Sequence, residues 1–345
     1  MLLSVLDQSP ISEGMTGAQA LRNSIDLARL ADRLGYHRYW VAEHHGGPML
    51  AGPSPEVLIG PIASATEQIR VGSGGVMLPH YSPLKVAESF SLLAGLYPGR
   101  IDLALGRAPG SDQLTMFALQ RDRRQAAPDD FPQQLAELLA YFEDDLPEDH
   151  PFRHLARTLP GRPELPVPWL LGSSPQSAVW AAELGLPYAF ADFINSQGAS
   201  IVANYREAFR PVRELQAPRT AIGVWVLCAP TDEEAEYLAT SSRMSFSMLR
   251  RGQLIAVPSP QTASAWLERE GRANGSASRG GRRTVVGSPE KVRAGIEEAA
   301  AEYQADEVIV VTITYDHEAR RRSYELLADA MGLQARTPAP ATAIA

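Results

Sequence analysis

The sequence predicts a single (β/α)8 barrel, or TIM barrel, over residues 1–335. Short apolar runs alternate with amphipathic helical stretches along the chain, which is typical of parallel α/β folds. These runs number eight, the strand count of a TIM barrel, whereas doubly wound open sheets more often have about five or six. A length of 345 residues leaves room for loop insertions in such a barrel.

The expected strands are short apolar runs bounded by polar or glycine-containing segments. They lie at Leu2–Leu6, Arg38–Val41, Ile69–Val76, Ile101–Leu105, Val167–Leu171, Tyr188–Ala191, Ala221–Ala229 and Glu307–Thr312. Between them, apolar residues recur at helical spacing, as in Leu21, Ile25, Ala28 and Leu34. We expect loop insertions at about 144–166, which is rich in proline and acidic residues, and at about 252–286, which contains a glycine- and serine-rich stretch. Residues 336–345 are expected to form a disordered tail.

Composition and charge exclude several classes of function. The formal net charge of −8 argues against nucleic-acid or acidic-membrane partners, because both require a basic surface. The single cysteine, Cys228, excludes an internal disulfide, and its apolar neighbours predict a buried, unreactive thiol. No apolar run approaches the roughly 18 residues of a membrane span. The N-terminus lacks the basic region of a signal peptide, so a cytoplasmic protein is expected. No metal site is expected, since no histidine or carboxylate cluster completes one.

The stretch Val71–Pro79 is the most informative part of the chain. It has the composition of a buried strand, yet three of its residues are glycines, at Gly72, Gly74 and Gly75. Glycine inside a strand packs nothing and marks a bulge or a close approach of another group to the backbone. The stretch therefore predicts either a bulge at a sheet edge or a place where a flat ligand lies against bare backbone.

Two histidines and an arginine follow expected strands, at the end of the barrel where active sites lie. His44 and His45 come just after the second strand, and at most one should face the central cavity because side chains alternate along an extended chain. The alternative is a histidine satisfied by loop carbonyls. Arg107 follows the fourth strand, where its planar guanidinium could grip an anion. An ion pair with a loop carboxylate such as Asp112 is the alternative.

The fifth strand turns directly into a helix that begins with an anion-binding pattern. Ser174 is the expected N-cap and Pro175 the first helical residue. The free backbone N–H groups and positive dipole end of that helix are joined by the hydroxyls of Ser173, Ser174 and Ser177. Such a cap alone is ordinary, but together with Arg107 on the neighbouring strand it predicts a phosphate site.

In this order, these segments resemble the bacterial luciferase-like flavin monooxygenases. The resemblance extends from Ser4 to about Leu333. It rests mainly on four segments at matching spacing: Ala42–His45, Gly72–Pro79, Pro98–Arg107, and Gly172–Ser174 followed by Trp180–Pro187. One such motif is weak support; four on one expected barrel are strong support.

The resemblance implies reduced FMN as the cofactor, bound by Gly74, Gly75, Met77, Arg107, Ser173, Ser174 and Ser177. Arg107, Ser174 and Ser177 would hold its phosphate, and its ring would lie against a cis peptide between Gly74 and Gly75. Glycines at both positions would ease the crowding there. The resemblance also implies His44 as the catalytic histidine, which would manage protons near a flavin C4a-hydroperoxide, a task that suits a side chain with a pKa near neutrality.

The implied reaction inserts one atom of dioxygen into a small organic substrate. Reduced FMN would come from a separate flavin reductase, since no G-x-G-x-x-G fingerprint follows any expected strand. The resemblance further implies a lid within 252–286 and a homodimer formed through the second and third helices. Ala87, Ser91 and Ala94 would allow close approach of two such helices, although interior packing explains them equally well.

Two positions depart from the family pattern. The light-emitting luciferase subunit carries a cysteine just before the phosphate-binding arginine, whereas this chain has Gly106, so light emission is not expected. Asp192 is expected at the cavity mouth, where many relatives carry a histidine.

Three other functions remain open at this point. One is an F420-dependent hydride-transfer oxidoreductase on the same barrel, and another is a catalytically silent flavin-binding protein. The last is a phosphate-handling isomerase or lyase, for which only Glu43 is placed to act as the base.

Overall fold

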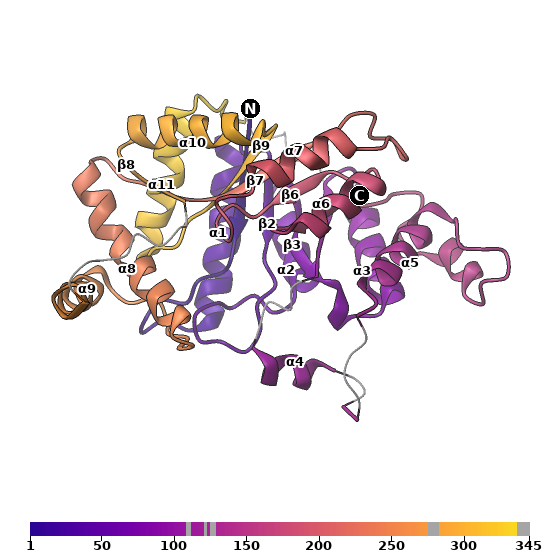
Figure 1. Cartoon of the computed structure of the whole chain (residues 1–345), viewed down its shortest axis with the longest axis horizontal. Helices are drawn as coiled ribbons and strands as arrows, with labels where there is room; N and C mark the ends of the chain where they lie inside the picture. Colours follow the sequence, from indigo (N-terminus) through magenta and orange to yellow (C-terminus); the bar gives the residue numbers. More distant parts are fainter. Residues whose placement is uncertain (108–111, 121–122, 125–128, 275–282, 337–345) are drawn as a thin grey trace.

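A closed ring of eight parallel strands forms the centre of the molecule. The computed structural model describes residues 1–107, 112–120, 123–124, 129–274 and 283–336. Around the ring the strands follow the order β1-β2-β3-β4-β5-β6-β7-β9, and β9 pairs again with β1. The helices lie around this ring (Figure 1). The predicted (β/α)8 TIM barrel is confirmed.

The strands match the eight predicted runs to within one residue at each end. Their bounds are β1 Leu2–Asp7, β2 Arg38–Val41, β3 Arg70–Met77, β4 Ile101–Gly106, β5 Val167–Gly172, β6 Tyr188–Phe190, β7 Thr220–Cys228 and β9 Glu307–Val311. Residues of β1, β2, β4, β7 and β9 are nearly all buried, because helices cover a parallel barrel outside while side chains fill it inside. Side chains on both faces of these strands are therefore buried, which explains why the strands are apolar runs without alternating polar residues.

Most helices follow a strand and pack on the outer surface of the barrel, whereas α4 lies beyond the ends of the strands (Figure 1). Their bounds are α1 Gly17–Leu34, α2 Pro55–Ser64, α3 Pro83–Leu96, α4 Gln113–Leu119, α5 Phe131–Glu143, α6 Pro175–Glu183, α7 Ala199–Ala208, α8 Asp232–Arg250, α9 Pro260–Asn274, α10 Pro289–Tyr303 and α11 His317–Ala330, with short 3-10 turns η1 Leu78–His80 and η2 Arg153–Thr158. No helix in the described ranges is long and apolar enough to cross a membrane.

One predicted loop insertion is only partly a loop. The segment 252–286 contains helix α9 and the start of an extra strand, β8 (Thr284–Gly287), which pairs with the far end of β7 outside the ring. The prediction of a loop over the whole segment is therefore wrong. A strand of four residues beside a glycine-rich stretch is too short to stand out by periodicity. The glycine-rich residues 275–282 and the predicted tail from residue 337 lie outside the described residues. The segment 144–166 is irregular apart from η2, as predicted.

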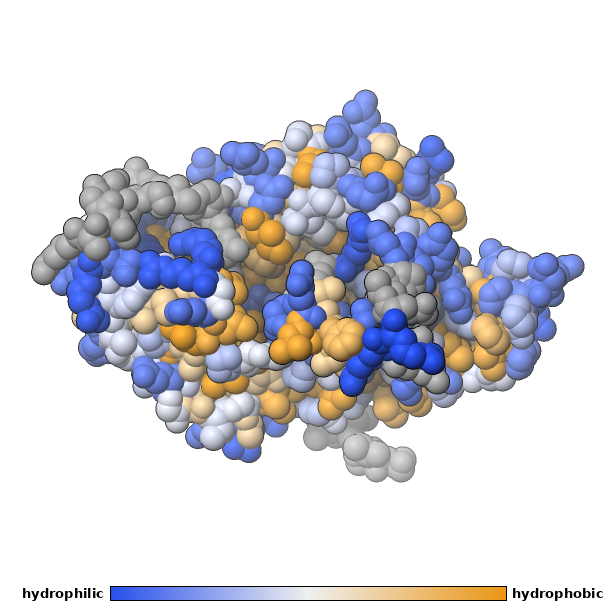
Figure 2. All heavy atoms as spheres, turned by 60° about the horizontal axis from the view of Figure 1, so that its bottom comes forward, coloured by the Kyte–Doolittle hydropathy of each residue, from blue (hydrophilic) through white to orange (hydrophobic). Residues whose placement is uncertain are grey.

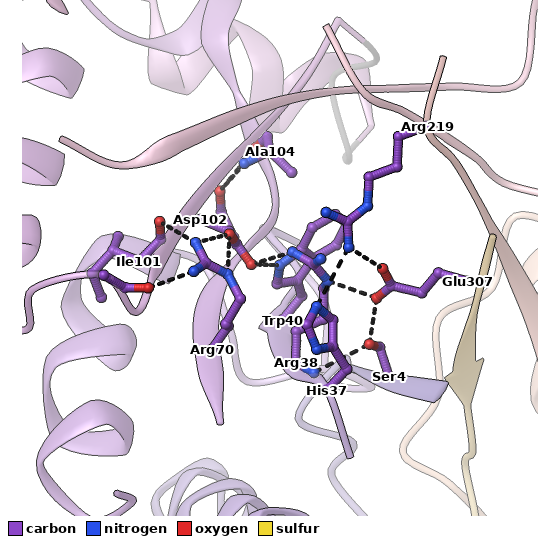
Figure 3. A network of polar contacts seen from close by, with 12 residues as sticks. Ser4, His37, Arg38, Trp40, Arg70, Ile101, Asp102, Ala104, Arg219 and Glu307 are labelled. Carbon is purple, nitrogen blue, oxygen red and sulfur yellow. Dashed lines mark hydrogen bonds and ion pairs between the residues drawn. The ribbon is translucent and has the colours of Figure 1, made fainter. Parts of the chain in front are cut away.

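The amino-terminal half of the barrel interior is closed by buried charges (Figure 3). Arg38, the first residue of β2, donates to Asp102 of β4 and to Glu307 of β9, each at 2.6 Å. All three side chains are at most 1% exposed. Burial alone would raise the pKa of Asp102, but the guanidinium groups of Arg38 and Arg70 hold it below its usual value.

Aromatic rings pack against these buried charges, and together they form the floor of the barrel interior. The guanidinium of Arg38 lies 4.7 Å from the ring of Trp169, and Trp40 packs edge-on against Trp169 at 5.3 Å. The indole N–H of Trp40 also donates to Asp102. These side chains fill the amino-terminal half of the barrel interior.

The structure tests the predictions about Cys228 and about the small residues of α3. Cys228 is buried, and burial raises the pKa of its thiol to about 11, so it is the unreactive thiol predicted. Ala87, Ser91 and Ala94 all face the interior, where the Ser91 hydroxyl accepts a hydrogen bond from the backbone N–H of Gly161. Interior packing is thus their role, and they are not available to a second copy.

Candidate active site

A cavity of about 580 Å³ opens at the carboxyl ends of the strands. Figure 2 looks toward this side of the molecule and shows hydrophobic residues gathered around a central hollow. Strand ends and the loops after them supply its lining, as in other TIM barrels. Of the site residues expected from the sequence, the cavity is lined by His44, Gly74, Met77, Arg107, Ser173, Ser174 and Ser177. Gly75 does not line it.

The glycines of β3 shape one wall of the cavity. The peptide between Gly74 and Gly75 is cis, as the family resemblance implies. The pairing of β3 with β4 shifts by one residue between Gly74 and Val76, so the predicted bulge is present. It is not at a sheet edge, because β3 has β2 on one side and β4 on the other.

Side chains would not fit at these glycines. A Cβ on Gly74 would come 2.5 Å from the side chain of Leu6, and one on Gly75 would come 2.6 Å from the carbonyl oxygen of Ala104. Gly74 is partly exposed to the cavity, whereas Gly75 is buried behind it. The wall is therefore bare backbone at Gly74, with Gly75 as its support.

Glu43, in the loop that follows β2, holds the end of β3 in place. Its carboxylate, 1% exposed, accepts from the backbone N–H of Met77 at 2.9 Å and lies 2.8 Å from Nε2 of His45. It also accepts from the hydroxyl of Tyr81, and burial together with this carboxylate raises the pKa of Tyr81. Both oxygens are engaged, so Glu43 is not a free general base. This removes the base on which an isomerase or lyase function depended.

His44 faces the cavity while His45 turns to Glu43, in keeping with the expected alternation. Nδ1 of His44 is buried and has no hydrogen-bond partner among the described residues. Burial, with a smaller contribution from His45, lowers the pKa of His44 to about 4. The expectation of a pKa near neutrality is wrong, because withdrawal of the ring from water disfavours its cation and the neighbouring His45 adds to this effect.

Arg107 reaches the cavity from the end of β4. Its guanidinium forms an ion pair with Asp129 at 2.6 Å, not with Asp112, which caps helix α4 by accepting from the N–H of Thr115. The arginine side chain is 49% exposed and lies 5.7 Å from the ring of Trp180. An exposed pair of this kind contributes little to stability, so the arginine can exchange Asp129 for another anion.

Helix α6 begins at the cavity wall as predicted. Ser174 is its N-cap and Pro175 its first residue, and the Ser174 side chain accepts from the N–H of Ser177. The hydroxyl of Ser177 is already engaged. It donates to the carbonyl oxygen of Ser174 at 2.8 Å and lies 2.9 Å from the hydroxyl of Tyr188. Ser173 and Ser174 therefore present freer hydroxyls to the cavity than Ser177.

Asp192 does not lie at the cavity mouth, contrary to expectation. It is fully buried, and Oδ1 accepts from the Tyr303 hydroxyl at 2.8 Å and from Arg283 at 3.3 Å. Burial raises the pKa of this carboxyl in spite of those two partners. The residues that follow it, Phe193 and Ile194, line the cavity instead, because the chain turns directly after β6.

Sequence reasoning missed several residues of the site. Trp180 lines the cavity from α6, three residues after Ser177, and this helical spacing could have found it. Gln8 follows β1 at the same end of the barrel as His44 and Arg107. Glu43 was considered only as a base, although a carboxylate beside two histidines also suits the positioning of one of them.

Comparison with known proteins identifies the family. The model of the family "luciferase-like monooxygenase" matches residues 1–307. The chain belongs to this family. Luciferase-like monooxygenase of Escherichia coli (strain K12) is 43% identical over 94% of this chain and 96% of its own length. N-acetyl-S-alkylcysteine monooxygenase of Bacillus subtilis (strain 168) is 39% identical over 95% of this chain and 98% of its own. The crystal structure of apo-MsnO8 has a TM-score of 0.87 at 43% identity, covering 97% of this chain and 99% of that one.

The family places the chain among the flavin-dependent monooxygenases, which are oxidoreductases. Two more distant structures share its barrel. The oxygenating constituent of 3,6-diketocamphane monooxygenase, solved with FMN, has a TM-score of 0.70 at 18% identity and covers 98% of this chain and 100% of its own. An F420-dependent secondary alcohol dehydrogenase has a TM-score of 0.67 at 14% identity and covers 95% of this chain and 98% of its own. Likeness at this identity speaks only for the fold.

Proposed function

We propose that this protein uses reduced FMN and dioxygen to oxygenate a small organic substrate. The observation that supports this most is the composition of one cavity. It combines a side suited to an anion, formed by Arg107 and the start of α6, with bare backbone at Gly74 and the imidazole of His44, whose Nδ1 has no partner among the described residues. A flavin mononucleotide needs the first two of these features, and oxygen chemistry on it is served by the third.

The donor set fits a phosphate. The guanidinium of Arg107 can form paired hydrogen bonds with its oxygens, and the N-terminus of α6 adds backbone N–H groups and hydroxyls from Ser173 and Ser174. Ser177 would contribute through its place in the first turn. Met77 and Gly74 would border the flat ring system, with Gly75 supporting the wall.

When bound, reduced FMN would supply the activation of dioxygen, by way of the C4a-hydroperoxide implied for this family. The protein's own residues would position the cofactor and keep water out, for which Leu171, Trp180 and Phe193 in the lining are suited. His44, neutral at physiological pH, can donate from one ring nitrogen and accept at the other. It would thereby hold or pass a proton at the reacting centre.

Two partners complete the proposal. A separate reductase would supply reduced FMN, as the lack of a nicotinamide fingerprint in the sequence suggests.

A second copy of the chain would cover the exposed apolar side chains of α2 and α3, which are Val57, Leu92 and Leu96. Sedimentation of the purified protein would test the dimer, with Leu96→Glu expected to yield monomers.

Cofactor binding and turnover test the function. We expect FMN to bind in the micromolar range or tighter, and Arg107→Ala to weaken that binding by at least about tenfold. His44→Ala should leave FMN affinity within about threefold while lowering substrate oxygenation by roughly a hundredfold or more. Micromolar F420 binding with no binding of FMN would replace the proposal with hydride transfer. FMN binding without any oxygenation across a substrate screen would indicate a silent flavin-binding protein.

A further inference from the structure

A second hollow of about 480 Å³ adjoins the first at the same end of the barrel. The two share Gln8, His44, Phe193 and Ile194 as a common wall. A molecule in the second hollow would therefore touch the same histidine that faces the proposed flavin site. Liquid water occupies roughly 30 Å³ per oxygen atom, so at the same volume per non-hydrogen atom the second hollow holds on the order of 15 such atoms.

The lining of this hollow is dominated by apolar side chains. Trp225 and Phe246 lie with ring centroids 4.7 Å apart, and Phe193 packs against Trp225 at 5.8 Å. Aliphatic side chains complete the walls, namely Met49, Leu50, Leu249 and Leu254. Figure 2 shows hydrophobic residues around the hollow at this face. A surface of this kind binds rings and alkyl chains by removing apolar area from water.

Few polar side chains line the hollow. They are Gln8, His44, His45 and Asp112, and His45 is held by Glu43. Among the described residues that line the hollow there is neither a lysine nor an arginine. A carboxylate in this space would lose hydration and meet Asp112, with no lysine or arginine of the described lining to pair with it, and each of these effects disfavours binding.

We propose that this hollow binds a neutral, largely apolar substrate, and that it discriminates against carboxylates. The proposal rests on the function proposed above. With a thioether as substrate, one atom of dioxygen would join the sulfur to give a sulfoxide and the other would leave as water. Reduced FMN would supply the two electrons and two protons and become oxidised FMN. The Bacillus subtilis relative is named for an N-acetyl-S-alkylcysteine, a compound that carries a carboxylate, so we expect the two proteins to differ in substrate charge.

A matched pair of ligands tests this inference by calorimetry on the protein without added flavin. The probes are N-acetyl-S-benzylcysteine and its methyl ester, which differ at pH 7.5 only in the charged end. We expect the ester to bind at least about tenfold more tightly than the acid. Trp225→Ala should weaken ester binding by about tenfold, and Leu254→Arg should recover binding of the acid, while neither should change FMN affinity.

Equal or tighter binding of the acid would overturn the inference, as would a lack of binding by both probes. Ester binding that Trp225→Ala leaves unchanged, in protein that still binds FMN, would place the ligand elsewhere and also overturn it. Failure of the proposed function has a different signature. In that case FMN would not bind, while the ester would still bind in preference to the acid.

Discussion

At the scale of single residues, the surroundings of His44 change the chemistry that its residue type suggests. A free imidazole titrates near neutrality, but withdrawal of this half-buried ring from water lowers its pKa to about 4. It is therefore neutral at physiological pH. Its neighbour His45, one residue on, binds Glu43 and helps to hold the end of β3. Two adjacent histidines thus serve different ends, because the His45 ring is held by Glu43 whereas Nδ1 of His44 has no partner among the described residues.

Titration of His44 should follow from this burial. The folded-state pKa lies below the value of 6.5 in the unfolded chain, so the unfolded state takes up the proton first as the pH falls. The contribution to stability is present above about pH 6.5 and is lost toward pH 4. We expect His44→Gln to reduce the acid sensitivity of the free energy of unfolding by on the order of 1 to 3 kcal/mol over that interval. Resonance titration showing His44 protonated near pH 6.5 in the folded protein would contradict this.

At the scale of secondary-structure elements, β3 is the strand that joins fold to site. Its glycines leave room for Leu6, Trp40 and Leu171 in the barrel interior and present backbone to the cavity at Gly74. Glu43 of the preceding loop anchors its last residue, Met77, through the backbone N–H. The strand is thus held at the position that the proposed cofactor would contact.

Substitution of Gly75 tests the packing of this strand. Gly75→Ala would place a Cβ 2.6 Å from a backbone oxygen, which cannot yield as a side-chain tip can. We expect a loss of about 1 to 3 kcal/mol in the free energy of unfolding measured with denaturant. Gly271→Ala on α9, where a Cβ meets open space, serves as the control and should be neutral or stabilising by up to about 1 kcal/mol. Similar effects of the two changes would show that Gly75 is not sterically required.

Comparison of elements shows what sequence reasoning can reach. The eight ring strands are apolar runs with polar or glycine-containing boundaries and were predicted to within a residue, and Ser174–Pro175 marked the start of α6. The strand β8 was missed because four residues beside a glycine-rich stretch carry no clear period. Asp192 was misplaced because its burial depends on Tyr303 and Arg283, which lie about a hundred residues away in sequence. Long-range partners of this kind leave no local signal.

At the scale of the whole molecule, the barrel divides its interior between structure and function. Buried charges and tryptophans close the amino-terminal half, while the carboxyl-terminal half holds two adjoining hollows. Arg38, Asp102 and Glu307 bring together β2, β4 and β9, and Ser4 of β1 hydrogen bonds to the same glutamate (Figure 3). A rigid floor of this kind fixes the strands whose ends carry the site.

Removal of the central charge should cost much of the protein's stability. Arg38→Met would remove one buried cation from both carboxylates. Among the described residues, Asp102 would keep its ion pair with Arg70 and the Trp40 N–H, and Glu307 would keep the longer contact to Arg219 and the Ser4 hydroxyl. We expect a loss of about 3 to 5 kcal/mol in the free energy of unfolding, measured by denaturant titration. Arg293→Met, which breaks an exposed pair with Glu297 on α10, is the control and should change stability by no more than about 0.5 kcal/mol. An Arg38 variant as stable as the control would refute a structural role for the floor.

The central claim is that the first cavity holds a flavin by its phosphate. Equilibrium binding of FMN and of riboflavin, which lacks the phosphate, tests it most directly. We expect wild-type protein and Arg293→Ala to prefer FMN by at least about tenfold, and Arg107→Ala to lose most of that preference while still binding riboflavin. Equal affinity of the wild-type protein for the two flavins, or an undiminished preference in Arg107→Ala, would contradict the account.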